Sequence, residues 1–90
     1  MISFLEERRR MAVKEMAIEY IKTKKLANES YEKYVEGRWR GLKYQFYSEY
    51  YHKYIEYEDE CLGLDISLGL IVKEGDYETI PEYREAILIG

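Results

Sequence analysis

The chain has 90 residues, of which 47% are hydrophobic and 36% charged, and a formal net charge of −4. This composition excludes a disordered chain, and the length is sufficient for one domain with a small core. No apolar run approaches the roughly 20 residues that cross a bilayer, and charges occupy the N-terminal positions where a signal peptide is apolar, so we expect a soluble, cytoplasmic protein. Cys61 is the single cysteine, which excludes an internal disulfide and fits a reducing compartment.

The charge is divided unequally along the chain. Residues 1–53 carry 12 basic and 8 acidic side chains, whereas residues 54–90 carry 2 and 10. A basic half could contact phosphates and an acidic half could contact a basic protein, while opposite charges could equally attract one another within the fold or across a dimer. We favour attraction within the fold or across a dimer.

The sequence predicts a first helix over residues 4–27. Ser3 and Glu6 have the spacing of a capping box, and neither Pro nor Gly interrupts the residues that follow. Apolar residues recur on a main face and along a thinner line on the opposite side, which implies contacts on two sides of this helix.

A second helix, predicted over residues 31–57, is unusually rich in tyrosine. Nine of the eleven tyrosines lie between positions 20 and 57. Large apolar or aromatic residues recur at steps of three or four, and the face they form begins with Tyr31, Val35 and Trp39 and continues to Tyr57. Gly37 and Gly41 weaken the pattern as one continuous helix, and the alternation after position 41 would also suit strands. An unbroken helix would be about 40 Å long in a globule about 30 Å across, so it either breaks near the glycines or protrudes.

The remaining residues predict a small antiparallel sheet. Residues 62–72 alternate with the two-residue repeat of a strand that has one buried face. Residues 73–76 predict a turn and residues 77–80 a returning strand, which Pro81 ends. Residues 82–89 suit a short helix or, as we slightly favour, a third strand, because two strands alone are marginally stable. The predicted fold class is a single-domain α+β fold, with two long helices before the sheet.

The aromatic residues of the second helix are the leading candidate for a binding surface. Aromatic rings bury large areas at low rotameric cost, and a helix that is aromatic on most sides is difficult for a small globule to cover. We therefore expect a non-catalytic interaction or regulatory protein that has no cofactor and whose partner is a second copy or another protein. The expected contact residues are Tyr31, Arg38, Trp39, Arg40, Phe46, Tyr47, Tyr50, Tyr51 and Tyr54.

Nucleic-acid binding through the basic N-terminal half is the main alternative. The segment from Arg38 to Tyr44 places basic groups beside aromatic rings, a combination that grips phosphates and stacks on exposed bases. Burial of Trp39 would remove this site, and the acidic last third of the chain would repel a phosphate backbone. The residues of this hypothesis are Arg8, Arg9, Arg10, Arg38, Arg40, Lys43 and Tyr44.

A metal site is the least favoured hypothesis. Glu49, His52 and Glu56 would share one helical face, and ferritin-like proteins use Glu-x-x-His together with carboxylates from a neighbouring helix, which Glu15 or Glu19 could supply here. A solvated charged edge explains the same residues more simply. The sequence also lacks a Gly-rich phosphate loop, zinc-ligand spacing and a Ser-His-Asp arrangement, so an enzyme is not favoured.

Overall fold

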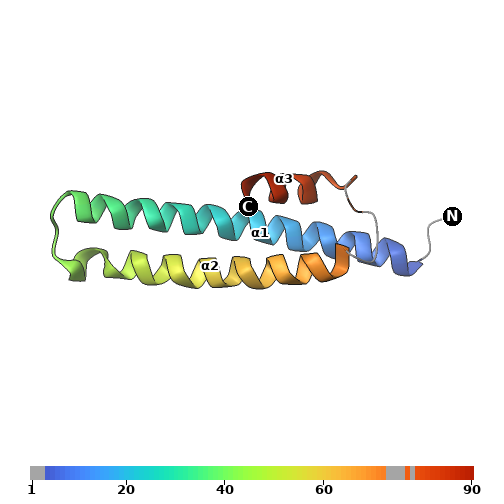
Figure 1. The fold of residues 1–90 in the computed structure, drawn as a ribbon, viewed down its shortest axis with the longest axis horizontal. Coiled ribbons are helices and arrows are strands. Elements are labelled where there is room, and N and C mark those ends of the chain that lie inside the picture. Colours follow the sequence, from blue (N-terminus) through green and yellow to red (C-terminus); the bar gives the residue numbers. More distant parts are fainter. Residues whose placement is uncertain (1–3, 73–76, 78) are drawn as a thin grey trace.

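The computed structural model describes residues 4–72, 77 and 79–90, and these form an elongated helical hairpin with a short third helix. Helix α1 spans Phe4–Trp39, α2 spans Tyr44–Val72 and α3 spans Pro81–Ile89. α1 and α2 lie side by side and antiparallel, and α3 packs along the N-terminal half of α1 (Figure 1). The molecule measures 60 × 17 × 16 Å, so it is a rod about two helices thick.

The predicted α+β fold is wrong for the described part of the chain, which contains helices and no strand. Residues 62–72, expected as the first strand, continue α2 to its end. An alternation of every second residue also contains steps of four, and the helix uses these steps: Leu64 and Leu68 turn inward, whereas Leu62, Ile66 and Leu70 are exposed. The apolar pattern is therefore compatible with both a strand and a helix. The helix forms because α1 packs against α2 along its whole length.

The other expected sheet elements are also absent from the described residues. Tyr77 and Ile80 lie in the connection to α3, where the Ile80 amide donates to the Tyr77 carbonyl at 3.0 Å as in a turn. Residues 82–89 belong to α3, which begins at Pro81, a suitable first residue because the first amide of a helix has no partner in the helix. The turn expected at residues 73–76 and the capping residue Ser3 lie outside the described residues.

The hairpin turn divides the Tyr-rich segment between the two long helices. α1 runs through the polar residues Asn28 and Ser30 to Trp39, and α2 begins at Tyr44. Gly41, at the turn, has φ 68°, a conformation that costs other residues about 1–2 kcal/mol. Gly37, in contrast, stays within α1 and is buried.

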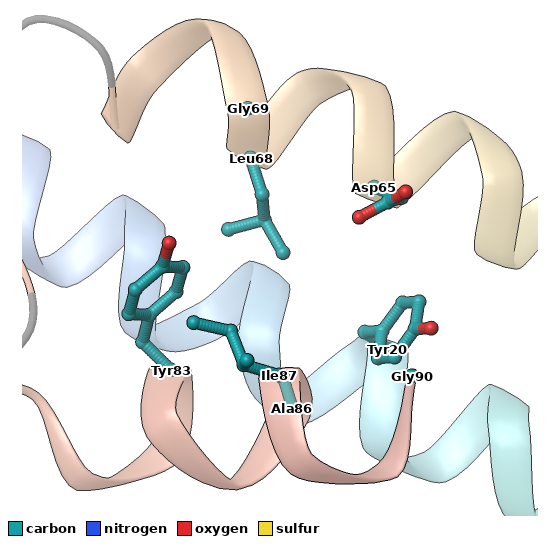
Figure 2. Close-up of a pocket in the computed structure, with 8 residues that line it drawn as sticks. All are labelled: Tyr20, Asp65, Leu68, Gly69, Tyr83, Ala86, Ile87 and Gly90. Atoms are coloured by element: carbon teal, nitrogen blue, oxygen red, sulfur yellow. The ribbon is translucent and has the colours of Figure 1, made fainter.

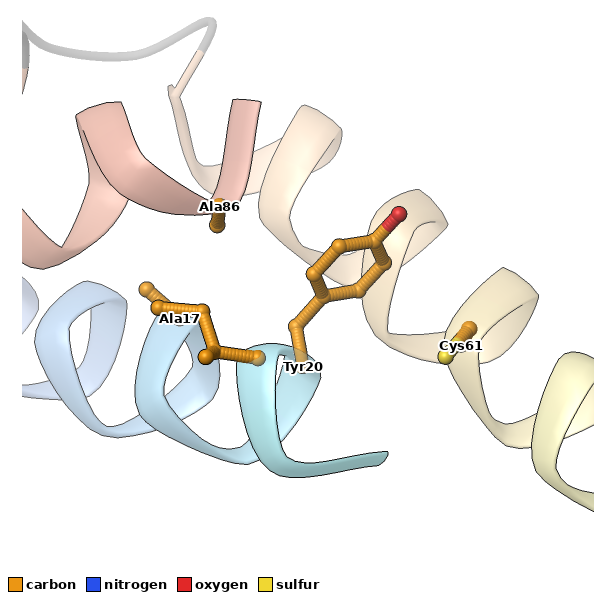
Figure 3. Packing of buried hydrophobic residues seen from close by; sticks show 5 residues of the cluster. Ala17, Tyr20, Cys61 and Ala86 are labelled. Carbon is orange, nitrogen blue, oxygen red and sulfur yellow. The ribbon is translucent and has the colours of Figure 1, made fainter. Parts of the chain in front are cut away.

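Two small clusters of buried side chains hold the three helices together near the α3 end. Tyr20 of α1 lies between Ala86 of α3 and Cys61 of α2 (Figure 3). A second cluster joins Val13 and Leu68 to the connection before α3. Among the described residues, Val13 is the largest side chain that is fully buried. The core is therefore thin, as two helices in contact along one line would produce.

Toward the turn, small residues of α1 face large residues of α2. Ala27, Ser30 and Gly37 are buried on α1. A Cβ placed on Gly37 would lie 2.6 Å from the Cβ of Tyr47, so the two backbones approach closely at this level. The absence of a side chain on Gly37 is thus part of the packing of α1 against α2.

Candidate interaction surfaces

Several of the predicted contact tyrosines pack against one another between α1 and α2. Tyr34, which the sequence prediction left out, lies at the centre of this group, with its ring centroid 5.6 Å from that of Tyr47 and 5.1 Å from that of Tyr51. Tyr31 and Tyr54 form a similar pair at 5.1 Å. These tilted and edge-on pairs stabilise by about 0.5–1.5 kcal/mol beyond the area they bury. These rings therefore join the helices as well as facing solvent, which reduces what they can offer a partner.

A second group of aromatic and aliphatic side chains is exposed around the turn, and we call it the hairpin tip. Trp39 is 86% exposed and Phe46 is 61% exposed. Trp39 also lines a shallow groove of ≈ 370 Å³ on α1 together with Tyr31 and Val35. The hairpin tip consists of Tyr31, Trp39, Leu42, Tyr44 and Phe46, all of them exposed.

The basic residues of the nucleic-acid hypothesis fall at opposite ends of the rod. Arg8 and Arg38 are separated by 30 residues of one helix, which corresponds to about 45 Å. Arg40 at the tip forms an ion pair with Glu36 at 2.9 Å, and the Arg38 guanidinium lies 5.8 Å from the centre of the Tyr34 ring. The structure therefore divides the seven predicted residues into two groups, and the group at the tip consists of Arg38, Arg40, Lys43 and Tyr44, with Trp39 beside them.

The predicted metal ligands are not brought together with further carboxylates. Glu49 forms an ion pair with Lys53 at 3.3 Å, and the His52 ring contacts that of Tyr51 at 6.0 Å. Tyr51, the neighbour of His52, packs against Tyr34 of α1. Glu19 lies 15 residues before Tyr34 on α1, which puts it about 22 Å along the helix from the level of these rings. Across residues 4–72, 77 and 79–90, no three His, Cys, Asp or Glu side chains gather closely enough to hold a metal ion.

A groove of ≈ 330 Å³ lies between α2 and α3. Leu68 and Asp65 of α2 face Tyr83 and Ile87 of α3 across it, with Tyr20 of α1 at one end (Figure 2). Burial raises the pKa of the Tyr20 hydroxyl, so it stays protonated to a higher pH than an exposed tyrosine does. The titratable residues that line the groove are Tyr20, Asp65 and Tyr83, and its described lining includes no histidine, lysine or arginine.

The lone thiol is also poorly suited to chemistry. Cys61 is buried at the level where Lys24 Nζ approaches Glu58 Oε1 at 3.1 Å. Burial raises the pKa of Cys61, and Lys24 opposes this shift only in part. Because the thiolate is the reactive form, a buried thiol with a raised pKa is inert at neutral pH.

A third exposed surface follows α2 away from the tip, and we call it the outer stripe. Its members are between 38% and 64% exposed. Ile55 and Ile66 are eleven residues apart, as are Tyr51 and Leu62, and eleven residues return to nearly the same side of a helix. The outer stripe consists of Tyr51, Ile55, Leu62, Ile66 and Leu70.

Comparison with protein-family models, curated protein sequences and solved structures finds no match to this chain. Among the described helices, none combines the length and the apolarity that crossing a bilayer requires.

Proposed function

We propose that this chain is a small, non-catalytic interaction protein of the cytoplasm, which acts when its exposed apolar surfaces are covered by another protein chain. The observation that carries the proposal is the hairpin tip, where Trp39 is 86% exposed beside Tyr31 and Phe46. Tryptophan and tyrosine dominate the energetics of protein interfaces because they bury large areas with few rotatable bonds. Exposure of a tryptophan is costly in water, so a partner that covers it gains that free energy.

The surface area of the whole chain supports the same proposal. Folded monomers of 10.9 kDa expose about 5,600 Å² according to the scaling of area with mass. This chain exposes 7004 Å². Its radius of gyration is 16.8 Å, compared with about 12 Å for a compact domain of this length. A rod with this much uncovered surface is suited to association rather than to enclosing a substrate.

Co-purification from the native source tests the tip as a protein-binding surface. We expect the wild-type chain to retain a partner in stoichiometric amount and the double variant Trp39→Ala, Phe46→Ala to lose it. Leu5→Ala is the matched control, because Leu5 is 68% exposed on α1 at the opposite end of the rod. Equal partner recovery with all three proteins would refute the tip as the binding surface.

Single-stranded nucleic acid is the second candidate for the tip, and the exposure of Trp39 favours it. A ring that projects between Arg38 and Arg40 can stack on a base while the guanidiniums contact phosphates. Binding should then weaken with rising salt and with Trp39→Ala, and Arg38→Ala should reduce the salt dependence. Binding that is absent, or indifferent to salt, excludes this candidate.

A further inference from the structure

We propose that the outer stripe of α2 is the interface of a homodimer in which two copies of α2 pack antiparallel. This inference rests on the proposed function, because it assigns an occupant to one of the uncovered surfaces. The occupant is a second copy of this chain. Of the hairpin tip only Tyr44 belongs to the interface, so Tyr31, Trp39, Leu42 and Phe46 stay available to another partner.

The area of the stripe is close to what a specific dimer needs. At roughly 200 Å² for a whole residue of this size, the exposed fractions of the five side chains amount to about 500 Å², and Tyr44 continues the line to about 650 Å². Specific interfaces bury about 600–1,000 Å² on each partner. Covering the stripe would remove nearly half of the excess surface of the isolated chain.

The thin core gives the second reason for a dimer. In the monomer, α2 buries side chains on one side alone, against α1, and its opposite side carries isoleucine and leucine into solvent. A second α2 placed on that side converts two hairpins into one four-helix layer with a shared apolar seam. An isologous contact of this kind closes on itself, so assembly stops at two copies.

The charges of α2 determine the direction of the second copy. In residues 44–53 the charges of Glu49 and Lys53, which pair at 3.3 Å, cancel each other. Residues 54–72 carry five carboxylates and neither lysine nor arginine. Glu58 is paired with Lys24, so a parallel pair would place the four other carboxylates beside four, whereas an antiparallel pair places the acidic part of one α2 beside the part of the other that has no net charge. Like-charge repulsion therefore favours the antiparallel direction.

The antiparallel direction also matches aromatic residues with aliphatic ones. The line from Tyr44 to Leu70 has its midpoint at residue 57. A two-fold axis there places Tyr44 level with Leu70 of the second copy, and Tyr51 level with residue 63 and therefore next to Leu62. A parallel pair would instead place each residue beside itself. Asp59 is the charged residue closest to the seam, and in the antiparallel pair it lies level with Ile55 of the second copy.

Solution mass provides the first test. Sedimentation equilibrium of the full chain should give twice 10.9 kDa, and Ile66→Glu should weaken the dimer at least tenfold. Ile87→Glu is the matched control, because Ile66 and Ile87 are each 57% exposed and Ile87 lies on α3, off the stripe. A monomeric wild-type chain, or equal weakening by both variants, overturns the proposal. Circular dichroism of each variant checks that the helices persist.

Mixed cysteine variants test the direction. In a Cys61→Ala background, Tyr51→Cys and Leu62→Cys proteins are oxidised separately and as a mixture. The antiparallel pair predicts a disulfide-linked dimer in the mixture and little in either protein alone. Strong cross-linking of each protein alone, with no gain in the mixture, overturns the antiparallel direction. If the tip variants lose their partner but remain dimeric, this inference stands. If the chain is monomeric and still binds a partner through Trp39, this inference fails and the proposed function stands.

Discussion

Gly37 and Tyr47 lie so close across the α1·α2 contact that a Cβ on the glycine would come within 2.6 Å of the Cβ of Tyr47. The Cβ of Tyr47 is fixed to the backbone of α2, so relief would require the two helices to separate. Gly37 is therefore the residue that sets the spacing of α1 and α2 near the turn.

Gly37→Ala should destabilise the protein by about 1–2 kcal/mol, because overpacking outweighs the better helix propensity of alanine. Gly63→Ala is the control, since Gly63 also lies within a helix but has open space where its Cβ would be, and it should stabilise by about 0.5–1 kcal/mol. Urea denaturation of both variants measures the free energy of unfolding. Stabilisation by both would show that the helices do not approach closely at Gly37.

Gly41→Ala should also destabilise, for a conformational reason rather than a steric one. Gly41 has φ 68° and nothing within 4 Å of where its Cβ would be, so the cost is that of a left-handed alanine, about 1–2 kcal/mol. Gly41→Asn should recover much of this loss, because asparagine tolerates the left-handed region. Equal stability of the wild type and Gly41→Ala in thermal denaturation would contradict this geometry of the turn.

Tyr34→Ala should cost about 1–3 kcal/mol, because Tyr34 is partly buried and its ring contacts those of Tyr31, Tyr47 and Tyr51. Trp39→Ala should change stability by less than about 0.5 kcal/mol, because an exposed side chain makes few contacts to lose. The two variants thus separate the rings that join the helices from those that face solvent. A large loss of stability in Trp39→Ala alone would reverse this assignment.

Alkaline pH should reduce stability. Burial raises the pKa of Cys61 and of Tyr20 in the folded chain, so the unfolded chain releases these protons first and folding becomes less favourable as pH rises. Burial lowers the pKa of Lys24, but the hydrogen bond and charge of Glu58 outweigh it and raise the pKa overall, so the Lys24–Glu58 contribution is intact below the ordinary lysine pKa and is lost above it.

These three groups have ordinary pKa values of about 8.5, 10 and 10.4, so the free energy of unfolding should fall from about pH 8.5 upward. Cys61→Ala should remove the earliest part of this decline and leave the part above pH 10. Urea titrations at a series of pH values measure both curves. A free energy that stays constant up to pH 11 in the wild type would contradict the burial of these groups.

The helical spacing of the Tyr-rich segment could be seen in the sequence, but its division between two antiparallel helices that pack on each other could not. Its turn falls at Gly41, within the interval that the two glycines mark. The extension of α1 through residues 28–30 could not be foreseen, because Ser30 resembles a helix cap in sequence and is instead a small residue that is buried in α1. A cap and a packing residue look alike until the opposing helix is known.

The strand prediction over residues 62–72 failed for a different reason. Alternating leucines and isoleucines satisfy a strand with one buried face and equally a helix that buries Leu64 and Leu68 and exposes Leu62 and Ile66. The sequence alone does not indicate which apolar residues are exposed to solvent, and a rod two helices thick exposes many of them.

Tyr34 was missed because the apolar face of its segment was placed on Tyr31 and the residues four and eight positions after it. The side of α1 that faces α2 at this level instead carries Ala27 and Ser30, seven and four residues before Tyr34, and Gly37, three residues after it. Small residues at helical spacing mark a close contact between helices, and that signal was available in the sequence.

The rod shape has one consequence for how the molecule can vary. α3 ends beside Tyr20, and Trp39 lies 19 residues farther along the same helix, about 28 Å away. Between them, α1 and α2 run side by side (Figure 1). Matched insertions or deletions of two turns in both helices would move the tip by about 10 Å and leave the ends intact. The length of the hairpin can thus change independently of the residues at either end.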